Sequence, residues 1–590
     1  MLEPDGRALL LDAFRPPEGY RLDYGVATTF TLHLDTALSV PLSFLSRRLA
    51  DSGDPIALME AVRAAADRLD IFHQAGMIAM PPSRSPIFSF LEPVLHAVRR
   101  PKAGHLFHPK LWALRYVADD DVADVRMRLL VPSRNLTADR SWDLCLQLEG
   151  QLGPDPVEGN SPVAELLTVL PGMCLSTMPP DRIARLDALV SDLQRTEWEL
   201  PEHVDELFFD VLGLGRPLAD DFFVGHEHLV ISPFCTDGGL ATVTGRTPAT
   251  VVSRQETLDG LDRSALGEHE TFVLDPLTSE MEDKGDGTHP SAIGLTGLHA
   301  KCFILRYGRK AWIRVGSANA TEAAFAGNVE ILVSLVGSAA KLGVTDLFKA
   351  ESSLRSILTE YSPQAAPDED DVAGQLGDLL IDLASGDFTA SVQSKDQGHL
   401  IQLQGPAIPT LPVGARVTVH PVTVPEFAAE VPPEQLIDVT FGPLEVDQIS
   451  AFVIITVMTQ EDVSASAVVL ADLVGAPINR LDEIIARQVD TPEKFLRFLA
   501  LLLGVGQPAW TVGMEPVGSA GASAAPAFEA PGLLELLMWA LVEHPGRLDD
   551  LARLVDRLGA SADRGSVLPD GFSEIWAVVD AVRRDQEAVA

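Results

Sequence analysis

The sequence predicts an α/β protein made of two similar halves, followed by a small β-rich module and C-terminal helices. The main observation is a nine-residue pattern that occurs twice, as HPKLWALRY at 108–116 and HAKCFILRY at 299–307, with five identical positions. Around each copy, segments with the period-two alternation of strands alternate with segments of helical period. This arrangement is typical of α/β sheets. A stretch rich in Pro and acidic residues follows at 362–371. Beyond it, the alternation of strands and helices gives way to short strands separated by Pro and Gly turns.

These changes divide the 590 residues into four regions. That number agrees with a typical domain length of roughly 150 residues. We expect the first two regions to be related by a pseudo-twofold axis, because their motifs occur in the same order. The regions are a first half at 1–210, a second half at 211–362, a β-rich module at 373–475 and a helical C-terminal region at 476–590.

Each half is expected to open with an alternating strand and to continue with further strands and amphipathic helices. In the first half, the expected elements are a strand at 25–35, a helix at 39–51, a strand at 76–80 and a helix at 182–195. In the second half they are strands at 229–234, 249–254 and 271–275. A short helix is also expected after a polar turn in each half, at 137–141 and 321–326.

The two C-terminal regions carry strand and helix signals but no catalytic motif. Strands are expected at 417–424, 437–441 and 451–458, and helices near 533–543 and 574–589. The clearest helix is TPEKFLRFLALLLG, with Thr491 as its N-cap, Pro492 at the first helical position and Gly504 at its end. We therefore expect a structural or partner-binding role for these regions, with other protein subunits as candidate partners.

The composition excludes several classes of protein. Asp and Glu number 84 against 45 Lys and Arg, which gives a formal charge of −39. A chain this acidic cannot cover nucleic acid or an anionic membrane with its whole surface, so a polyanion must bind in a local basic cleft. The 4 cysteines are scattered, which excludes a disulfide scaffold. No segment has the character of a signal peptide or a membrane span, so we expect a cytoplasmic protein without a membrane partner.

The repeated pattern places a His and a Lys two residues apart in each half. Because residues i and i+2 of a strand project from the same face, we expect His108 beside Lys110 and His299 beside Lys301. Such a pair suits a phosphate, since the ammonium neutralises the oxyanion and the imidazole attacks phosphorus or transfers a proton. The pattern holds no cluster of carboxylates for Mg²⁺, so we expect neither a metal nor another cofactor.

Each His-Lys pair is followed by a polar turn and then by an acidic residue. The turns read PSRN and GSAN, and they end at Asn135 and Asn319, whose amides can donate hydrogen bonds to phosphate oxygens. Asp143 and Glu330 then begin the next alternating strand of each half. If the halves face each other, these sets form one site with two His, two Lys and two Asn side chains.

Together these motifs resemble the phospholipase D superfamily, whose members carry HxK with a downstream GSxN, twice per active site. The resemblance covers roughly residues 20–360, with the motifs at 108–143 and 299–330. GSAN matches the family element, whereas PSRN has Pro in place of Gly. Lipid-hydrolysing members usually place an Asp five residues after the Lys, where this chain has Arg115 and Arg306. Both halves are thus HKN, which is more similar to the tyrosyl-DNA phosphodiesterase branch and related nucleases.

The resemblance implies a role for each motif residue. In the family, one His forms a covalent phosphohistidine, the other protonates the leaving group, and an acid from one half supports the His of the other. Carried over to this chain, the resemblance assigns attack to His108 and acid catalysis to His299. Glu330 would then support His108, and Asp143 would support His299, with Gln147 as an alternative to Asp143.

Further side chains are candidates with two interpretations each. Arg115 and Arg306 either reach substrate phosphates or pair with the abundant carboxylates. Other candidate substrate-binding residues are the turn residues Ser133 and Ser317. Aromatic and imidazole side chains that could line a site, but that also fit a core or structural role, are Trp112, Trp312, His105, His226 and His228. The basic cleft is expected from Arg99, Arg100, Lys102, Lys110, Arg115 and Arg134.

Three functions from different classes are compatible with the sequence. The favoured one is a metal-independent phosphodiesterase that cleaves nucleic acid, as a DNA nuclease or end-processing enzyme within a bacterial DNA-processing or anti-phage defence system. The second is a hydrolase or transferase acting on phospholipids or small phosphodiesters. The third is a non-catalytic interaction protein that retains the fold. The two complete His-Lys pairs disfavour the third function, and the missing Asp disfavours the second.

Overall fold

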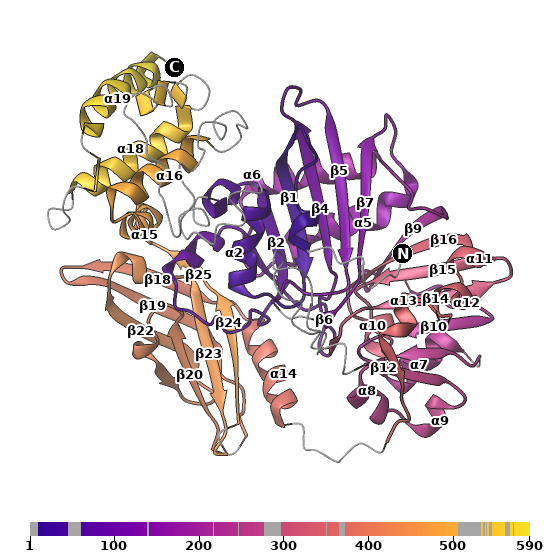
Figure 1. Cartoon of the computed structure of the whole chain (residues 1–590). Coiled ribbons are helices and arrows are strands. Elements are labelled where there is room, and N and C mark those ends of the chain that lie inside the picture. Colours follow the sequence, from indigo (N-terminus) through magenta and orange to yellow (C-terminus); the bar gives the residue numbers. More distant parts are fainter. Residues whose placement is uncertain are drawn as a thin grey trace, which may run out of the picture.

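Two large mixed sheets pack against each other in the computed structural model, with a β-rich module and a helical region beside them (Figure 1). The expected α/β class is therefore present. The structure describes residues 10–44, 61–138, 141–215, 217–245, 247–275, 297–349, 351–364, 372–412, 414–461, 463–504, 533–534, 537–538, 540–541, 545–560, 567–569 and 571–589.

The first sheet has seven strands in the order β3-β2-β1-β4-β5-β7-β8. β1 pairs in parallel with β2 and antiparallel with β4. The sheet therefore has a parallel part that is extended by antiparallel strands. Its strands are β1 (Tyr20–Thr29), β2 (Leu69–Gln74), β3 (Leu95–Val98), β4 (Leu111–Ala118), β5 (Val125–Pro132), β7 (Cys145–Leu152) and β8 (Thr196–Trp198).

The second sheet has eight strands in the order β17-β12-β11-β10-β14-β15-β16-β9. Within it, β12-β11-β10-β14-β15-β16 repeats the order and the strand directions of β3-β2-β1-β4-β5-β7. Its strands are β9 (Val204–Leu212), β10 (Glu227–Ile231), β11 (Thr250–Val252), β12 (Glu270–Leu274), β14 (Cys302–Tyr307), β15 (Lys310–Gly316), β16 (Glu330–Ser338) and β17 (Leu358–Glu360).

One apolar core joins the two sheets. Val26 and Leu129 of the first sheet and Ile304 and Ile313 of the second belong to it, together with the inner faces of two helices. These helices are α5 (Ser161–Met173) and α6 (Pro180–Gln194). The outer face of the second sheet packs on α7 (Asp237–Thr244) and α8 (Gln255–Asp259). The shorter helices of this half are α9 (Arg263–Leu266), α10 (Glu322–Ala326), α11 (Ala339–Leu342), α12 (Val344–Leu347) and α13 (Ser353–Ser356).

The β-rich module is a sandwich of two four-stranded sheets over its own core. It begins with the helix α14 (Val372–Ala384). One sheet contains β18 (Thr389–Lys395), β19 (Gly398–Ala407), β22 (Leu436–Leu444) and β25 (Asp472–Val474). The other contains β20 (Arg416–Pro421), β21 (Ala429–Val431), β23 (Phe452–Met458) and β24 (Ser464–Leu470).

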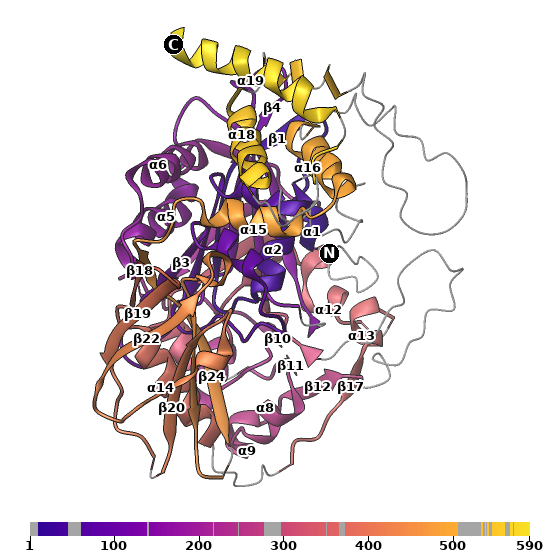
Figure 2. The ribbon, with the colours of Figure 1, turned by 90° about the vertical axis from the view of Figure 1, so that its left-hand side faces the viewer.

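The C-terminal helices cover the outer face of the first sheet. They are α15 (Arg480–Gln488), α16 (Pro492–Gly504), α18 (Pro545–Ala560) and α19 (Phe572–Val589), and Figure 2 shows them gathered beside β1 and β4. Their apolar side chains share a core with that sheet, with α1 and α2 (Leu10–Ala13 and Leu34–Ser43) and with the short helix at Pro86–Leu91. Thr491 caps α16 as expected, because its hydroxyl accepts from Lys494 N at 3.3 Å. None of the described helices has the length and apolar character to cross a bilayer.

A buried ion pair fastens the helical region to the first half. Arg480 and Glu92 bond to each other with side chains that are 9% and 10% exposed. Glu92→Ala would leave the Arg480 charge without its carboxylate partner, so we expect the free energy of unfolding to fall by about 3–5 kcal/mol. Asp387→Ala removes the exposed partner of Arg99 and is expected to cost at most about 1 kcal/mol. Urea titrations followed by circular dichroism would measure both, and equal effects would contradict the prediction.

Three local expectations differ from the structure. Residues 76–80 do not form a strand, because the core strand is β2, which ends at Gln74, and Ile78 makes only isolated bridges. No helix occupies 137–138, and Ser141 already belongs to the short strand β6 (Ser141–Trp142). The expected boundary at 210/211 falls within β9, which pairs with β16 of the second sheet. Residues 45–51 of the expected helix at 39–51 lie outside the described residues.

Candidate active site

Both His-Lys pairs lie immediately before a strand rather than within one. β4 begins at Leu111 and β14 at Cys302, one residue after each Lys. The chain is nevertheless extended enough that Lys110 Nζ donates to the carbonyl of His108 at 3.0 Å, and Lys301 Nζ to that of His299 at 3.0 Å. In the second pair, Lys301 Nζ also lies 3.3 Å from Nδ1 of His299, so that ammonium lies beside its imidazole although the strand itself does not place it there.

Each His is anchored to the opposite half by its backbone. His108 N donates to the carbonyl of Val329 at 2.9 Å, and His299 N donates to that of Trp142 at 2.8 Å. Parallel pairing supports both contacts, between Phe107 and Val329 and between β13 (Gly297–Leu298) and β6. The loop that carries each His is thus held by the strand that follows the Asn of the other half. This exchange brings both pairs to the junction of the two sheets.

The backbone register makes Asp143 the counterpart of Glu330. Ser317 N donates to Ile331 O at 2.9 Å and Ser317 Oγ accepts from Ile331 N at 2.9 Å. Ser133 makes the same two bonds with Leu144, at 2.7 and 2.9 Å. The residue before each partner is the acid, despite the different spacing in the sequence. Gln147, the alternative, is exposed and donates to Glu149 at 2.8 Å.

Glu330 holds His108 from within the core. Its carboxylate is fully buried, and both of its oxygens lie 2.9 Å from Nδ1 of His108. Ser317 Oγ also donates to it, and Asn328 Nδ2 donates at 3.2 Å. Burial alone would raise the pKa of Glu330, but His108, Lys110 and these hydrogen bonds outweigh it, so the pKa is lowered and the carboxylate stays ionised. An ionised Glu330 accepts the Nδ1 proton and leaves the Nε2 lone pair of His108 available.

Burial also changes the ionisation of the basic groups. The pKa of His108 is lowered to about 4, mainly by burial, with Glu330 opposing and Lys110 adding to the effect. Burial lowers the pKa of Lys110 to about 7, against the attraction of Glu330. For Lys301, burial and then repulsion from Lys110 lower the pKa well below its ordinary value. The two ammonium groups therefore repel each other, and an anionic phosphate bound between them would offset this repulsion.

The second pair contacts the first half directly. His299 Nδ1 lies 3.0 Å from the carbonyl of Ser133 and 3.3 Å from Lys301 Nζ, and that ammonium donates to the same carbonyl at 3.2 Å. Asp143 pairs with Arg134 at 3.2 Å. Ser133 and Ser317 are buried, and their hydroxyls bond to the neighbouring strand or to Glu330. Both serines thus position other groups instead of facing a substrate.

The two Asn side chains share an unusual feature. The Oδ1 atoms of Asn135 and Asn319 are buried, and no donor in the described part of the chain reaches either one. Matched unmet polar atoms at equivalent positions are uncommon in a core and typical of a functional site. Neither Asn begins a helix, since 135–138 are not helical and α10 starts only at Glu322. A helix dipole therefore does not assist Asn135.

The two arginines expected to bind substrate phosphates form ion pairs with carboxylates instead. Arg115 pairs with Asp23 and Asp192, and Arg306 pairs with Glu227. Arg115 also lies five residues beyond Lys110, about 16 Å along an extended strand. Neither arginine is therefore placed at the His-Lys pairs.

The expected basic cleft is also largely absent from the described residues. Arg99 and Arg100 pair with Asp387 and Asp382 of the β-rich module. Of the remaining candidates, Lys110 belongs to the site, Arg134 pairs with Asp143, and Lys102 is exposed. These surface arginines fasten regions of the protein together because the chain is rich in carboxylates.

Four residues around the site were not predicted from the sequence. Arg254 lowers the pKa of Lys301, donates to the carbonyl of Leu298 at 2.9 Å and lies 4.8 Å from the ring centre of Phe234. In the first half, Phe30 packs edge-on against His108 with ring centres 5.0 Å apart. Thr29 and Ser232 hold the residue after each Asn, since their hydroxyls accept from Leu136 N at 3.1 Å and Ala320 N at 3.0 Å. Of these four, only Thr29 and Ser232 could have been found from the sequence, because each is a hydroxyl residue at the end of the opening strand of its half.

The other singled-out side chains have structural roles. Trp112 is buried with Phe14 at 4.4 Å between ring centres, and His228 bonds to the carbonyl of Phe223 at 3.0 Å. His226 stacks on Tyr307, and His105 bonds to the carbonyl of Ala103 at 3.2 Å. Within the described ranges, no three His, Cys, Asp or Glu side chains gather as metal ligands would.

Comparisons with known proteins give similarity in chain path only. No protein-family model matches the chain, and no curated protein matches it. A yeast tyrosyl-DNA phosphodiesterase mutant is 12% identical with a TM-score of 0.35, covering 56% of this chain and 84% of its own. Phosphatidylserine synthase from Haemophilus influenzae is 10% identical with a TM-score of 0.32, covering 63% and 88%. Polyphosphate kinase from Porphyromonas gingivalis is 10% identical with a TM-score of 0.27, covering 55% and 44%.

Proposed function

We propose that this chain is a phosphodiesterase that cleaves nucleic acid through a phosphohistidine intermediate and needs no metal. The observation that carries the proposal is the junction of two His-Lys pairs from different sheets, with the fully buried Glu330 bonded to His108 Nδ1. A buried carboxylate that fixes the tautomer of a neutral His is the arrangement that a nitrogen nucleophile requires. The repelling ammonium groups of Lys110 and Lys301 supply the matching anion site.

The reaction proceeds in two displacements. Nε2 of His108 attacks phosphorus and forms a P–N bond, while the bond from phosphorus to the leaving oxygen breaks and His299 gives that oxygen a proton. His299 then takes a proton from water, the water oxygen bonds to phosphorus, and the P–N bond breaks to restore His108. Lys110 and Lys301 neutralise the phosphoryl oxygens throughout, and the amides of Asn135 and Asn319 donate to the same oxygens. We propose that Asp143, the counterpart of Glu330 by backbone register, supports His299 as Glu330 supports His108.

Nucleic acid is the substrate class that the surroundings favour. Phe234 is 46% exposed beside Arg254, and Phe30 is half-buried beside His108. Aromatic rings next to cations suit a single strand, because bases stack on the rings while phosphates meet the charges. The cations beside these rings give the site a local positive charge, which attracts a polyanion although the chain as a whole carries a large negative charge.

Purified protein incubated with labelled single-stranded DNA, duplex DNA, RNA and phospholipid vesicles would test the proposal. We expect cleavage of a nucleic acid that survives EDTA, since Lys110, Lys301 and the two Asn side chains supply the charge stabilisation. His108→Ala is the inactive control, and His399→Ala, in β19 of the β-rich module, is the matched control that keeps activity. Cleavage of lipid alone would replace the substrate class, and strict dependence on Mg²⁺ would overturn the mechanism.

The pH dependence of kcat/KM follows from the lowered pKa values. His108 attacks only when neutral, and its pKa of about 4 means that kcat/KM rises as the pH increases through about 4. Lys110 stabilises the phosphoryl oxygens only as an ammonium, and its pKa of about 7 means that kcat/KM falls as the pH increases through about 7. We therefore expect a bell-shaped profile with an acidic optimum, measured with an oligonucleotide substrate. A profile that rises steadily to pH 9 would contradict this assignment.

A further inference from the structure

The two His-Lys pairs differ in the group that faces Nδ1 of each histidine. Nδ1 of His108 faces the carboxylate of Glu330, with both oxygens at 2.9 Å. Nδ1 of His299 faces the carbonyl of Ser133 at 3.0 Å, and Lys301 Nζ donates to the same carbonyl at 3.2 Å. Because a carbonyl oxygen only accepts hydrogen bonds, Nδ1 of His299 carries a proton and Nε2 is left for a substrate. The second histidine therefore has a neutral partner where the first has an anion.

The acidic residue of the first half forms an ion pair with an arginine. Asp143 lies 3.2 Å from Nε of Arg134, and both side chains are 21% exposed. Asp143 is also close to His299 along the backbone, because it follows Trp142, whose carbonyl accepts from His299 N at 2.8 Å. Its negative charge acts on Lys301 of the same pair. The carboxylate is thus next to the second His-Lys pair, and the arginine offsets its charge there.

This arginine has no counterpart in the second half. Arg134 is the third residue of the turn PSRN, and the same position of the turn GSAN is the fully buried Ala318. Nη2 of Arg134 also donates to the carbonyl of Thr137 at 2.7 Å, so the arginine closes the turn that carries the Ser133 carbonyl. The corresponding turn of the second half has no cation. The two halves therefore differ at one position that controls both neighbours of His299.

The difference suits the two histidines to different steps of a phosphoryl transfer. A carboxylate beside an imidazolium stabilises the protonated form and so makes it a weaker acid. At His299, Arg134 offsets the charge of Asp143, so the imidazolium gives up its proton more readily. When Nε2 releases its proton to the leaving oxygen, the proton on Nδ1 stays bonded to the Ser133 carbonyl, and no side chain has to move.

We propose that Arg134 is a positioning residue, which holds Asp143 and the Ser133 carbonyl so that His299 acts as the acid of the pair. Asp143 then supports His299 at a strength that Arg134 sets. This role rests on the proposed function, in which His299 supplies the proton. Besides Asp143, the charged groups that act on Lys301 beside His299 are Lys110, Glu330 and Arg254, and every variant below keeps them.

The pKa of His299 in the resting protein tests the proposal without any substrate. It is measured by NMR of protein labelled at the histidine rings, and the His299 signal is the one lost in His299→Ala. Arg134→Gln removes the cation, so we expect the pKa of His299 to rise by about 1 pH unit. Arg134→Lys keeps a cation and should raise it by less than half as much. Arg126→Gln is the matched control, because Arg126 lies at the other end of β5, where its Nε donates to Tyr20 Oη at 3.2 Å.

Asp143→Asn should change the same pKa in the opposite direction. It removes the carboxylate and keeps Arg134, so the protonated form of His299 loses an attraction and its pKa should fall. This variant also keeps the proposal testable if Arg134→Gln does not fold, which thermal melting of each variant shows.

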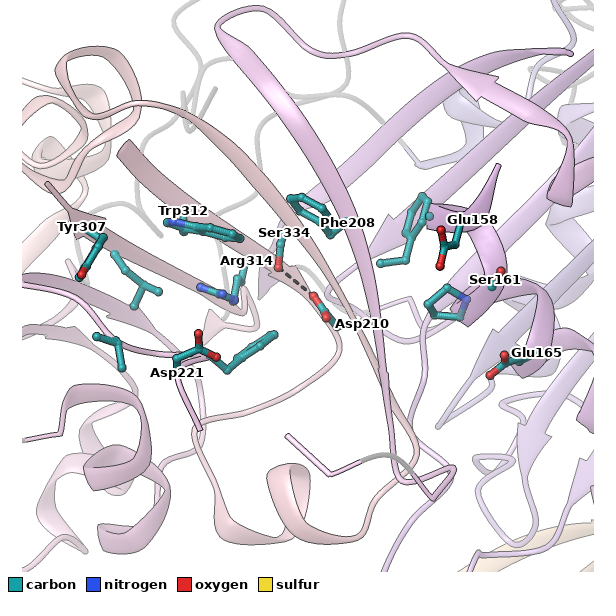
Figure 3. Close-up of a pocket in the computed structure, with 16 residues that line it drawn as sticks. Glu158, Ser161, Glu165, Phe208, Asp210, Asp221, Tyr307, Trp312, Arg314 and Ser334 are labelled. Atoms are coloured by element: carbon teal, nitrogen blue, oxygen red, sulfur yellow. Dashed lines mark hydrogen bonds between the residues drawn. The ribbon is translucent and has the colours of Figure 1, made fainter. Parts of the chain in front are cut away.

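The matched control for Asp143→Asn is Asp210→Asn. Asp210 accepts from Ser334 Oγ at 2.9 Å and likewise lies near an arginine, Arg314, in a cavity of about 820 Å³ lined by strands of the second sheet (Figure 3). Leu305 also lines that cavity, four residues beyond Lys301, which is about 13 Å along an extended strand. This variant should leave the pKa of His299 unchanged.

Cleavage rates measure the effect on the acid step. With an unactivated oligonucleotide, at a pH where His299 is protonated in both proteins, Arg134→Gln should lower kcat/KM about threefold, because a weaker acid slows the departure of the leaving group. With an oligonucleotide ester of p-nitrophenol, whose leaving group needs no proton, the rate should not change.

Several outcomes would overturn the role of Arg134. They are an unchanged pKa of His299 in Arg134→Gln, a rise in Arg134→Lys as large as that in Arg134→Gln, no fall in Asp143→Asn, or equal losses of rate with both substrates. If the pKa changes occur but neither substrate is cleaved, the proposed function fails while the charge balance at His299 stands.

Discussion

Replacement of His108 by alanine is expected to abolish phosphodiester cleavage, with a loss in kcat of about 10⁴-fold or more, because no other group can form the covalent intermediate. His299→Ala removes the acid instead. With an oligonucleotide ester of p-nitrophenol, whose leaving group needs no proton, this variant should still form the intermediate and accumulate a phosphoryl adduct. Mass spectrometry of the quenched protein should place that adduct on His108.

The matched controls separate this result from a loss of structure. His399→Ala should behave as the unchanged protein, and the double variant His108→Ala/His299→Ala should give no adduct. An adduct on His299 in the His108→Ala protein would exchange the two roles, which the similar order of the halves permits. Absence of any adduct in a variant that still turns over the activated ester would exclude covalent catalysis.

Glu330→Gln is expected to lower kcat by about 10³–10⁴-fold with little change in KM. The carboxylate accepts the Nδ1 proton of His108, as the 2.9 Å contacts indicate, and so keeps the Nε2 lone pair free. A glutamine amide can donate to Nδ1 instead, which moves the proton to Nε2 and blocks attack. The variant also loses an attraction that raises the pKa of His108, so any residual acid limb should shift to lower pH.

Single-turnover kinetics would measure this effect as a slower rate of adduct formation. Glu322→Gln, at the exposed first position of α10, is the matched control and should change neither kcat nor the adduct rate. Retention of full activity by Glu330→Gln would mean that the buried carboxylate serves stability only. Asp143→Asn should affect the step that needs His299, the release of a poor leaving group, more than the reaction of the activated ester.

The sequence by itself determined the α/β class. It did so because the repeated HxK pattern and the capped helix at Thr491 are local signals, in which side-chain type and short spacing fix the structure. The pairing of Glu330 with His108 also followed from the resemblance. For Asp143, the tertiary structure was needed, because a different turn length hides its equivalence until the bonds of Ser133 and Ser317 are compared.

Only the tertiary structure decided the electrostatics. The sequence predicted that Arg99 and Arg100 line a basic cleft. In the structure they form ion pairs with Asp387 and Asp382, which lie nearly three hundred residues away in the chain. Arg254 shows the opposite, because nothing around it in the sequence marks it, and the fold places it next to Lys301. Charge pairing and burial depend on contacts between distant segments, and they set the pKa values of the site. A pattern of neighbouring residues holds no information about these contacts.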